Sequence, residues 1–185
     1  MEKLFFYFWR KRLFSSMKEG KFLEVGVGTG KNLKFYPKIK GEKFAIDISE
    51  KMLKFARTKA EKFELDVNFK VMNVEKLEFE DNFFDFVLGT FVFCSVAEPL
   101  KGLKEINRVL KPQGRLFLIE HVKPQNWFLG KIFDLFNPLI KRIMGPNINR
   151  RTVDNLRRSG FKITSEINLL SDIFKFIVAQ PIKVS

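Results

Sequence analysis

The stretch Glu24-Val25-Gly26-Val27-Gly28-Thr29-Gly30 decides the fold of this chain of 185 residues. Its glycines stand at every second position and follow the run Lys21 to Val25, which reads as a buried parallel strand. Glycine lets the backbone leave a strand in a tight turn and approach a ligand more closely than any side chain would permit. We therefore expect a strand, a ligand-binding turn, and a helix over Lys31 to Tyr36 that Pro37 ends.

Outward from this turn, strands and helices alternate along the chain. The expected strands are Glu42 to Ile48, Val67 to Asn73, Phe84 to Thr90 and Arg115 to Val122. The expected helices are Glu50 to Phe63, with Ser49 as its N-cap, and Pro99 to Lys111, closed by Pro112-Gln113-Gly114. Such alternation predicts a parallel sheet that is covered on both faces and binds its ligands at the carboxyl ends of the strands.

The C-terminal part reads differently. A helix over Thr152 to Gly160 precedes two strands, Phe161 to Leu170 and Ile173 to Gln180, and the turn between these strands is very short. Such a turn joins only antiparallel strands. The predicted fold class is therefore α/β, with a Rossmann-like, mostly parallel seven-stranded sheet, helices on both faces and an antiparallel C-terminal hairpin strand. We expect one domain over residues 1–185.

Composition narrows the class of protein. Hydrophobic residues make up 45% and charged residues 30%, and Lys plus Arg exceed Asp plus Glu by 34 to 21, a net charge of +13 that attracts nucleic acid or acidic lipid. The single cysteine, Cys94, and the single histidine, His121, exclude a disulfide scaffold and structural zinc, so no metal is expected. The longest nearly uncharged run, Phe86 to Ala97, is too short to span a bilayer, and no signal peptide is visible. The expected location is cytoplasmic or peripheral on the inner membrane face.

Two acids next to the glycine turn indicate the ligand. A dinucleotide fold would need its third glycine where Lys31 stands, and Glu24 would repel a pyrophosphate but suits a cationic ligand such as a sulfonium with an amino group. Asp47 follows Gly26 by 21 residues, at the end of the second strand, where an acid accepts the hydroxyls of a ribose. A glycine-rich turn alone is often only a turn, but with both acids it predicts a nucleoside ligand that carries a positive charge.

On these residues the chain resembles the class I S-adenosylmethionine-dependent methyltransferases. The segments that carry the resemblance are Phe22 to Pro37, Ala45 to Leu53, Asn73 to Leu77, Phe84 to Val87, Thr90 to Phe93 and Lys104 to Val122. It implies S-adenosylmethionine as cofactor, bound by Glu24, Gly26, Gly28, Gly30, Asp47, Ile48, Asn73, Val74 and Thr90. Relatives often carry Asp at Asn73, whose amide oxygen still accepts the adenine amino proton; the other reading of Asn73 is a turn residue at a strand end.

A finer resemblance concerns the acceptor. Phe91 to Val96, Glu120 to Val122 and Gly145 to Arg150 look like segments of bacterial phosphatidylethanolamine N-methyltransferases and membrane-associated thiol methyltransferases. This implies a small or amphiphilic acceptor (a phospholipid amine, a thiol or a quinone-like ring) near Phe91, Phe93, Glu120 and Arg150. His121 is the candidate general base, because its ordinary pKa is near neutrality, or else it only hydrogen-bonds at the pocket edge. Cys94 is read as packing.

Two segments are candidates for contact with an anionic membrane or with the acceptor. In residues 1–18, an amphipathic helix places Phe5, Phe6, Trp9, Leu13 and Met17 on one face, so it either lies on anionic lipid or packs over its own domain. Residues 123–151, which include the apolar and basic run Trp127 to Met144, are expected to form a substrate-side insertion. Its apolar face either meets an acyl or prenyl chain or packs as a plain core helix. Alternatives to a lipid-type acceptor are RNA or DNA, disfavoured because Thr90-Phe91-Val92-Phe93 replaces an Asn-Pro-Pro-Tyr type of motif, and a non-catalytic cofactor-binding subunit.

Overall fold

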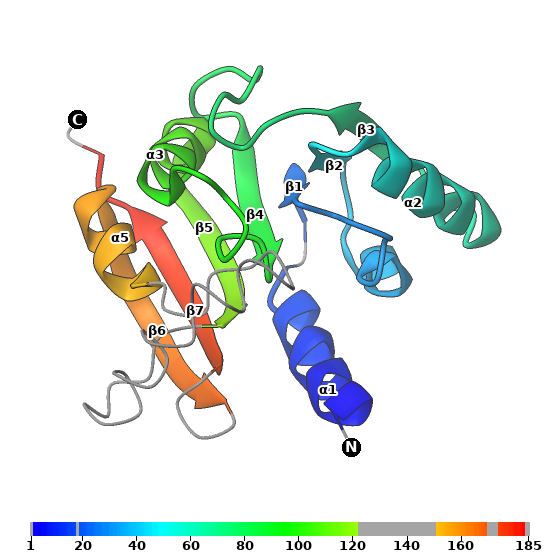
Figure 1. Cartoon of the computed structure of the whole chain (residues 1–185), viewed down its shortest axis with the longest axis horizontal. Coiled ribbons are helices and arrows are strands. Elements are labelled where there is room, and N and C mark those ends of the chain that lie inside the picture. Colours follow the sequence, from blue (N-terminus) through cyan, green and yellow to red (C-terminus); the bar gives the residue numbers. More distant parts are fainter. Residues whose placement is uncertain (1, 18, 122–150, 170–173, 184–185) are drawn as a thin grey trace.

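The computed structural model describes residues 2–17, 19–121, 151–169 and 174–183. The part up to β4 contains α1 (Glu2–Ser15), β1 (Phe22–Val25), the 3₁₀ helix η1 (Leu33–Lys38), β2 (Lys43–Asp47), α2 (Glu50–Lys62), β3 (Asn68–Val71) and β4 (Phe84–Thr90). It is followed by α3 (Pro99–Val109), β5 (Leu110–His121), α5 (Thr152–Arg158), β6 (Phe161–Leu169) and β7 (Phe174–Pro181). The arrangement is drawn in Figure 1.

One twisted sheet organises the molecule (Figure 1). Its strands lie in the order β3-β2-β1-β4-β5-β7-β6, and all neighbouring pairs from β3 to β5 are parallel. Only β7 runs against its neighbours, β5 and β6. The predicted fold class is therefore confirmed, including the antiparallel C-terminal hairpin.

Each face of the sheet is covered by helices, because the strand side chains are apolar on both faces. On one face, α1, η1 and α2 contribute buried residues to a core that includes Phe22, Leu88 and Phe117. On the other, α3 and α5 pack over a core that includes Leu23, Val87 and Leu118. The crossovers place the carboxyl ends of β1, β2 and β4 at the same end of the sheet, where the glycine turn follows β1.

Two elements differ from the expectation. The helix after the glycine turn is a 3₁₀ helix that contains Pro37, because a proline without an N–H cannot continue the α-helical hydrogen bonds in so short a segment. Strand β5 begins at Leu110, and its register shifts between the pairs Phe84–Leu110 and Phe86–Arg115. The segment Pro112-Gln113-Gly114, expected to close the preceding helix, thus lies inside this strand as an irregularity.

The second half of α1 belongs to the core. Leu13 and Phe14 are fully buried, and the ring of Phe14 stacks on that of Phe35 with centroids 5.5 Å apart. One to two turns earlier, Tyr7 is 41% and Phe8 60% exposed. None of the helices in the described ranges is long and apolar enough to cross a bilayer. The predicted insertion at 123–151 lies outside the described residues, apart from Arg151.

Candidate active site

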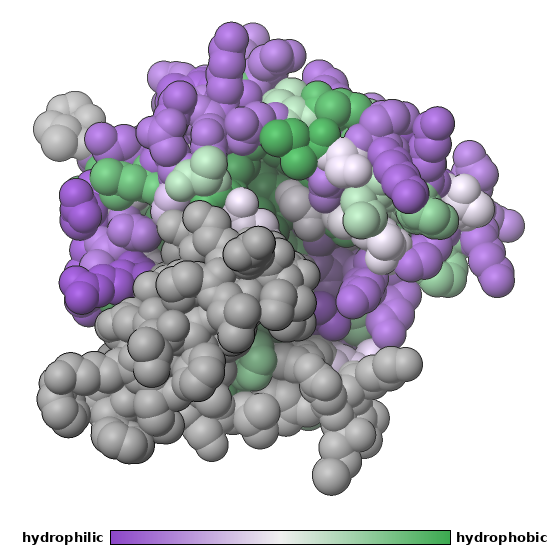
Figure 2. Space-filling model, viewed as in Figure 1, coloured by the Kyte–Doolittle hydropathy of each residue, from purple (hydrophilic) through white to green (hydrophobic). Residues whose placement is uncertain are grey.

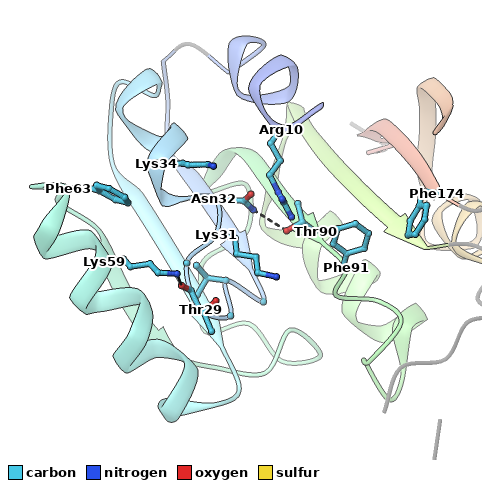
Figure 3. A pocket seen from close by; sticks show the side chains of 14 residues that line it. Arg10, Thr29, Lys31, Asn32, Lys34, Lys59, Phe63, Thr90, Phe91 and Phe174 are labelled. Carbon is cyan, nitrogen blue, oxygen red and sulfur yellow. Dashed lines mark hydrogen bonds between the residues drawn. The ribbon is translucent and has the colours of Figure 1, made fainter. Parts of the chain in front are cut away.

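A pocket of about 1010 Å³ lies beside the glycine turn, between α1, η1, α2 and the carboxyl end of β4 (Figure 3). Glycines and cationic and aromatic side chains share its lining. The residues are Arg10, Gly26, Val27, Gly28, Thr29, Gly30, Lys31, Asn32, Lys34, Lys59, Phe63, Thr90, Phe91 and Phe174. Of the residues predicted to bind the cofactor, the three glycines and Thr90 are therefore brought together in one place.

Asp47 fixes the glycine turn from the neighbouring strand. One carboxylate oxygen accepts the Gly28 N–H at 2.8 Å, and the other accepts the Ser49 N–H at 2.9 Å. A Cβ built on Gly28 would have no protein atom within 4 Å, so the backbone there faces open space. Each carboxylate oxygen has a second lone pair, which leaves Asp47 able to accept a further hydrogen bond from a ligand hydroxyl.

Glu24 is buried beneath the turn and is not one of the lining residues. Its two oxygens accept hydrogen bonds from Asn32 Nδ2 at 2.7 Å and from the Tyr36 hydroxyl at 2.6 Å. Burial raises the pKa of Glu24 to about 7, while these two hydrogen bonds and the nearby Arg10 oppose the rise. The carboxylate predicted to face the ligand's positive charge thus acts on the pocket through Asn32.

Asn32 is the residue that connects Glu24 to the pocket. Its Nδ2 also donates to Thr90 Oγ1 at 3.0 Å, and this bond is the dashed line in Figure 3. The carboxylate fixes the orientation of the amide, because only the NH₂ group can donate to it. Asn32 Oδ1 is then buried without a partner in the described part of the chain, an arrangement that fits a ligand ammonium as donor.

The loop after β4 forms the opposite wall. Phe91 has a φ of 58°, its N–H donates to the Ile119 carbonyl at 2.8 Å, and its ring meets Phe174 edge-on at 5.9 Å. Glu120 holds the next two residues, because its Oε1 accepts the N–H groups of Val92 and Phe93 at 2.9 and 3.2 Å. Glu120 Oε2 is buried with no partner among the described residues, and burial raises the pKa of Glu120 to about 7.

The remaining predicted site residues are placed as follows. Ile48 is 72% exposed beside Asp47, whereas Val74 is buried in the core on the α3 side. Asn73 is exposed and its Oδ1 accepts the Glu75 N–H at 2.9 Å, as a turn residue would. Phe93 is 1% exposed in the core and does not line the pocket.

Two of the predicted site residues have side chains outside the described part of the chain. His121 ends β5 opposite Phe174, but its side chain lies outside the described residues, and so does Arg150. Cys94 is buried, in agreement with its interpretation as packing. In the described ranges no cluster of histidine, cysteine, aspartate and glutamate could hold a metal ion.

Sequence reasoning missed several lining residues. They are Arg10, Val27, Thr29, Lys31, Asn32, Lys34, Lys59, Phe63 and Phe174. Lys31 could have been found from its position directly after the last glycine, where a loop passes over a ligand. Arg10, Lys59 and Phe174 come from three separate elements, and nothing local in the sequence marks them as neighbours.

Comparison with known proteins identifies the family. The family model described as a methyltransferase domain matches residues 23–118, which is more than half of the chain. The chain belongs to this methyltransferase family. The family confirms the predicted enzyme class, an S-adenosylmethionine-dependent methyltransferase, and its predicted cofactor.

Individual relatives agree with this assignment. The ubiquinone/menaquinone biosynthesis C-methyltransferase UbiE of Shewanella sp. (strain W3-18-1) is 34% identical over 151 residues, covering 77% of this chain and 60% of that protein. The methyltransferase thus spans about 60% of the length of the curated relatives it matches. A SAM-dependent methyltransferase from Aquifex aeolicus is 26% identical with a TM-score of 0.68, covering 91% of this chain and 85% of that one.

Similarity of fold alone does not identify the reaction. The structure of the [4+2]-cyclase SpnF has a TM-score of 0.79 at 20% identity and covers 94% of this chain and 80% of that one. A chain with this fold can therefore carry a cyclase name, and the reaction of the methyltransferase has to be argued from its family and its site.

Proposed function

We propose that this methyltransferase transfers the methyl group of S-adenosylmethionine to a carbon atom of an amphiphilic, quinone-type ring. The observation that carries the cofactor part is the buried Oδ1 of Asn32, which has no partner among the residues that the structure describes and lies beside a glycine turn that Asp47 holds. The acceptor part is supported by the C-methyltransferase relatives, of whose length this chain spans 60%. When bound, the cofactor supplies an electrophilic methyl group on a sulfonium.

The residues of the turn would hold the two ends of the cofactor. Asp47 has a free lone pair on each oxygen for the ribose hydroxyls, and exposed Ile48 offers an apolar surface for the adenine, with Asn73 and Val74 on the next strand end. At the other end, Asn32 Oδ1 would accept a hydrogen bond from the ammonium. Glu24 would act through Asn32, stabilising positive charge without direct contact.

The acceptor ring would lie against aromatic side chains. Phe91 and Phe174 meet edge-on at one wall of the pocket, and such a pair presents an apolar surface to a flat ring. Glu120 would be a positioning residue, since it binds the backbone of the loop that carries Phe91. His121 is the proposed base: its backbone pairs with Phe174, and it would take the proton of a ring hydroxyl, which enriches the adjacent carbon in electrons.

A lipid-soluble acceptor would be met at a membrane surface, and we extend the proposal to that partner. The start of α1 keeps Tyr7 and Phe8 partly exposed, at 41% and 60%, next to Lys11 and Arg12. On the face in Figure 2 the outer parts of the described surface are mainly hydrophilic. With a net charge of +13, such a surface is attracted to anionic headgroups.

One labelling experiment tests the acceptor. The protein is incubated with S-adenosylmethionine carrying a labelled methyl group and, separately, with quinol, phospholipid, thiol and RNA pools. We expect label on the quinol ring carbon. Label on phospholipid or thiol would instead support the finer resemblance noted from the sequence, label on RNA would support a nucleic-acid enzyme, and no label in any pool would support a non-catalytic subunit.

A second experiment tests the base. His121→Ala should lower turnover about 10²–10⁴-fold at neutral pH and leave the affinity for S-adenosylhomocysteine unchanged, because the base acts on the acceptor. Turnover of the mutant should partly recover as the pH rises, since the ring hydroxyl then ionises in solvent. A mutant that keeps more than about a third of the wild-type turnover would assign His121 to the pocket edge.

A further inference from the structure

We propose that Arg10 and Lys31 form a subsite for an anionic oxygen group, a carboxylate or a phosphate, at the mouth of the pocket. The inference rests on the proposed function, because it names a ligand group of the same pocket. The anionic group has two possible sources: the amino-acid tail of the cofactor, or an acid group on the acceptor.

The charge of the pocket lining is one-sided. Four of its side chains are cationic, namely Arg10, Lys31, Lys34 and Lys59, and none of the described lining residues is acidic. S-adenosylmethionine itself carries a net positive charge, from a sulfonium and an ammonium against one carboxylate. Such a ligand does not by itself explain a wall of four cations, because like charges in a partly enclosed site repel.

Two of the four cations are engaged within the protein. Lys59 Nζ donates to the Thr29 carbonyl at 2.6 Å and so supports the glycine turn from α2. Lys34 Nζ lies over the ring of Tyr7 at 4.5 Å and over the ring of Phe35 at 5.2 Å. These contacts account for Lys34 and Lys59 as structural cations.

Arg10 is not accounted for in this way. Within the described ranges its Nε is buried with no hydrogen-bond partner, and its guanidinium makes no ion pair. Among the described residues, the nearby charge of Glu24 compensates the guanidinium, and that carboxylate already accepts hydrogen bonds from Asn32 and Tyr36. A guanidinium with an unmet buried donor is suited to bind a carboxylate or phosphate in a bidentate manner.

Lys31 completes the subsite from the other side. It follows the last glycine of the turn, is exposed, and has no ion pair in the described ranges. In Figure 3, Arg10 points from α1 towards Asn32 and Thr90, and Lys31 extends from the turn into the space between the turn and Phe91. Both side chains line the same pocket as Phe91 and Phe174, so an anionic group held there would lie next to the aromatic wall.

The test compares ligands with and without a carboxylate. S-adenosylhomocysteine and 5′-methylthioadenosine share the nucleoside and the thioether, but only the former has the amino-acid tail. If the anion comes from the cofactor, Arg10→Gln should weaken S-adenosylhomocysteine roughly ten- to a hundredfold in calorimetry and leave 5′-methylthioadenosine unchanged. Lys31→Gln should act in the same direction, with a smaller effect because it is exposed.

A phosphate titration tests the other possible source of the anionic group, the acceptor. If the anion belongs to the acceptor, both variants should keep wild-type affinity for S-adenosylhomocysteine, and inorganic phosphate should bind the wild-type protein saturated with S-adenosylhomocysteine but not Arg10→Gln. The matched control is Lys11→Gln, one residue along α1, where the side chain is exposed and outside the lining. Circular dichroism checks that every variant is folded.

The subsite is overturned if Arg10→Gln and Lys31→Gln match Lys11→Gln in both titrations. Failure of the proposed function would give a different binding result. In that case the wild-type protein would bind neither nucleoside, while phosphate titrated without any nucleoside would still report whether Arg10 and Lys31 bind an anion.

Discussion

At the scale of single residues, two glycines of the turn have opposite surroundings. Gly28, with a φ of 54°, would point a Cβ into open space. Gly30, with a φ of 71°, would place a Cβ 2.5 Å from Leu33 Cδ1 and 3.2 Å from Ala56 Cα. The first glycine keeps space for a ligand, and the second keeps space for packing between η1 and α2.

Substitution of Gly28 should therefore mainly affect ligand binding, and substitution of Gly30 should mainly affect stability. Gly28→Val should abolish measurable binding of S-adenosylhomocysteine, because a branched side chain fills the ligand space, and should lower the free energy of unfolding by about 1–3 kcal/mol through backbone strain. Gly30→Ala should cost more stability, since the clash with Leu33 and the tight contact with Ala56 add to the same strain. Calorimetry and urea denaturation measure the two effects. Equal losses of stability and affinity in both variants would contradict this division.

Asp47 is the second residue of the site whose role can be tested by substitution. Asp47→Ala removes the acceptor of the Gly28 and Ser49 N–H groups and the expected contact to the ribose, so the affinity for S-adenosylhomocysteine should fall about ten- to a hundredfold. The matched control is Asp66→Ala, an exposed acid before β3. An unchanged affinity in Asp47→Ala would remove this residue from the site.

The sequence predicted some of these residues and not others, for a physical reason. Asp47 and the glycines follow from a fixed spacing along adjacent parallel strands, and the structure joins them by a hydrogen bond. Asn32 was missed because a lone amide carries no pattern until its partners, Glu24 and Thr90, are known to be neighbours. Arg10 was missed because it reaches the pocket only through the packing of α1.

Helix α1 combines exposed and buried aromatic side chains. Phe14 is fully buried between η1 and β1, with its ring near those of Phe35 and Phe22, whereas Phe8 is mostly exposed. The expectation that the helix covers its own domain therefore holds for its second half. The expectation of membrane contact has to be tested on the first half alone.

Two substitutions in α1 separate these roles. Phe14→Ala should lower the free energy of unfolding by about 3–5 kcal/mol, because it opens a cavity in the core. Phe8→Ser should leave stability within about 0.5 kcal/mol, as surface changes do, and should reduce sedimentation with anionic vesicles. Thermal unfolding and vesicle sedimentation measure these outcomes. If Phe8→Ser sediments like the wild-type protein, the first half of α1 does not contact lipid.

Elements with a strong pattern were predicted closely, and irregular ones were not. Strand β4 has the predicted bounds, and Ser49 caps α2 by accepting the Met52 N–H. The short η1 and the register shift of β5 were missed because they depend on tertiary contacts. Propensity sets the type of long elements, while packing sets the ends and the bulges.

Two buried carboxyl groups make the free energy of unfolding of the whole molecule depend on pH. Burial raises the pKa of both Glu24 and Glu120 from the ordinary value of 4.5 to about 7. Between these pH values the folded protein binds protons that the unfolded chain has released. The contribution of each group to stability is complete below about pH 4.5 and is lost as the pH rises through 7.

Glu120→Gln tests this coupling. It keeps an acceptor for the Val92 and Phe93 N–H groups but no longer titrates. Relative to this variant, the wild-type protein should lose roughly 3 kcal/mol of unfolding free energy between pH 4.5 and 7.5. Urea denaturation across this range measures the difference, and Glu61→Gln, exposed on α2, is the control. Parallel pH profiles for wild type and Glu120→Gln would contradict the coupling.

The position of β7 has a consequence for synthesis of the protein. β7 follows β6 along the chain but lies between β5 and β6 in the sheet. A growing chain that has emerged as far as β6 therefore exposes one edge of β5 and both edges of β6, and unpaired edges invite aggregation. On the ribosome, the open edge of β5 and the facing edge of β6 are paired only when Phe174–Pro181 has emerged and entered the gap between two strands made before it.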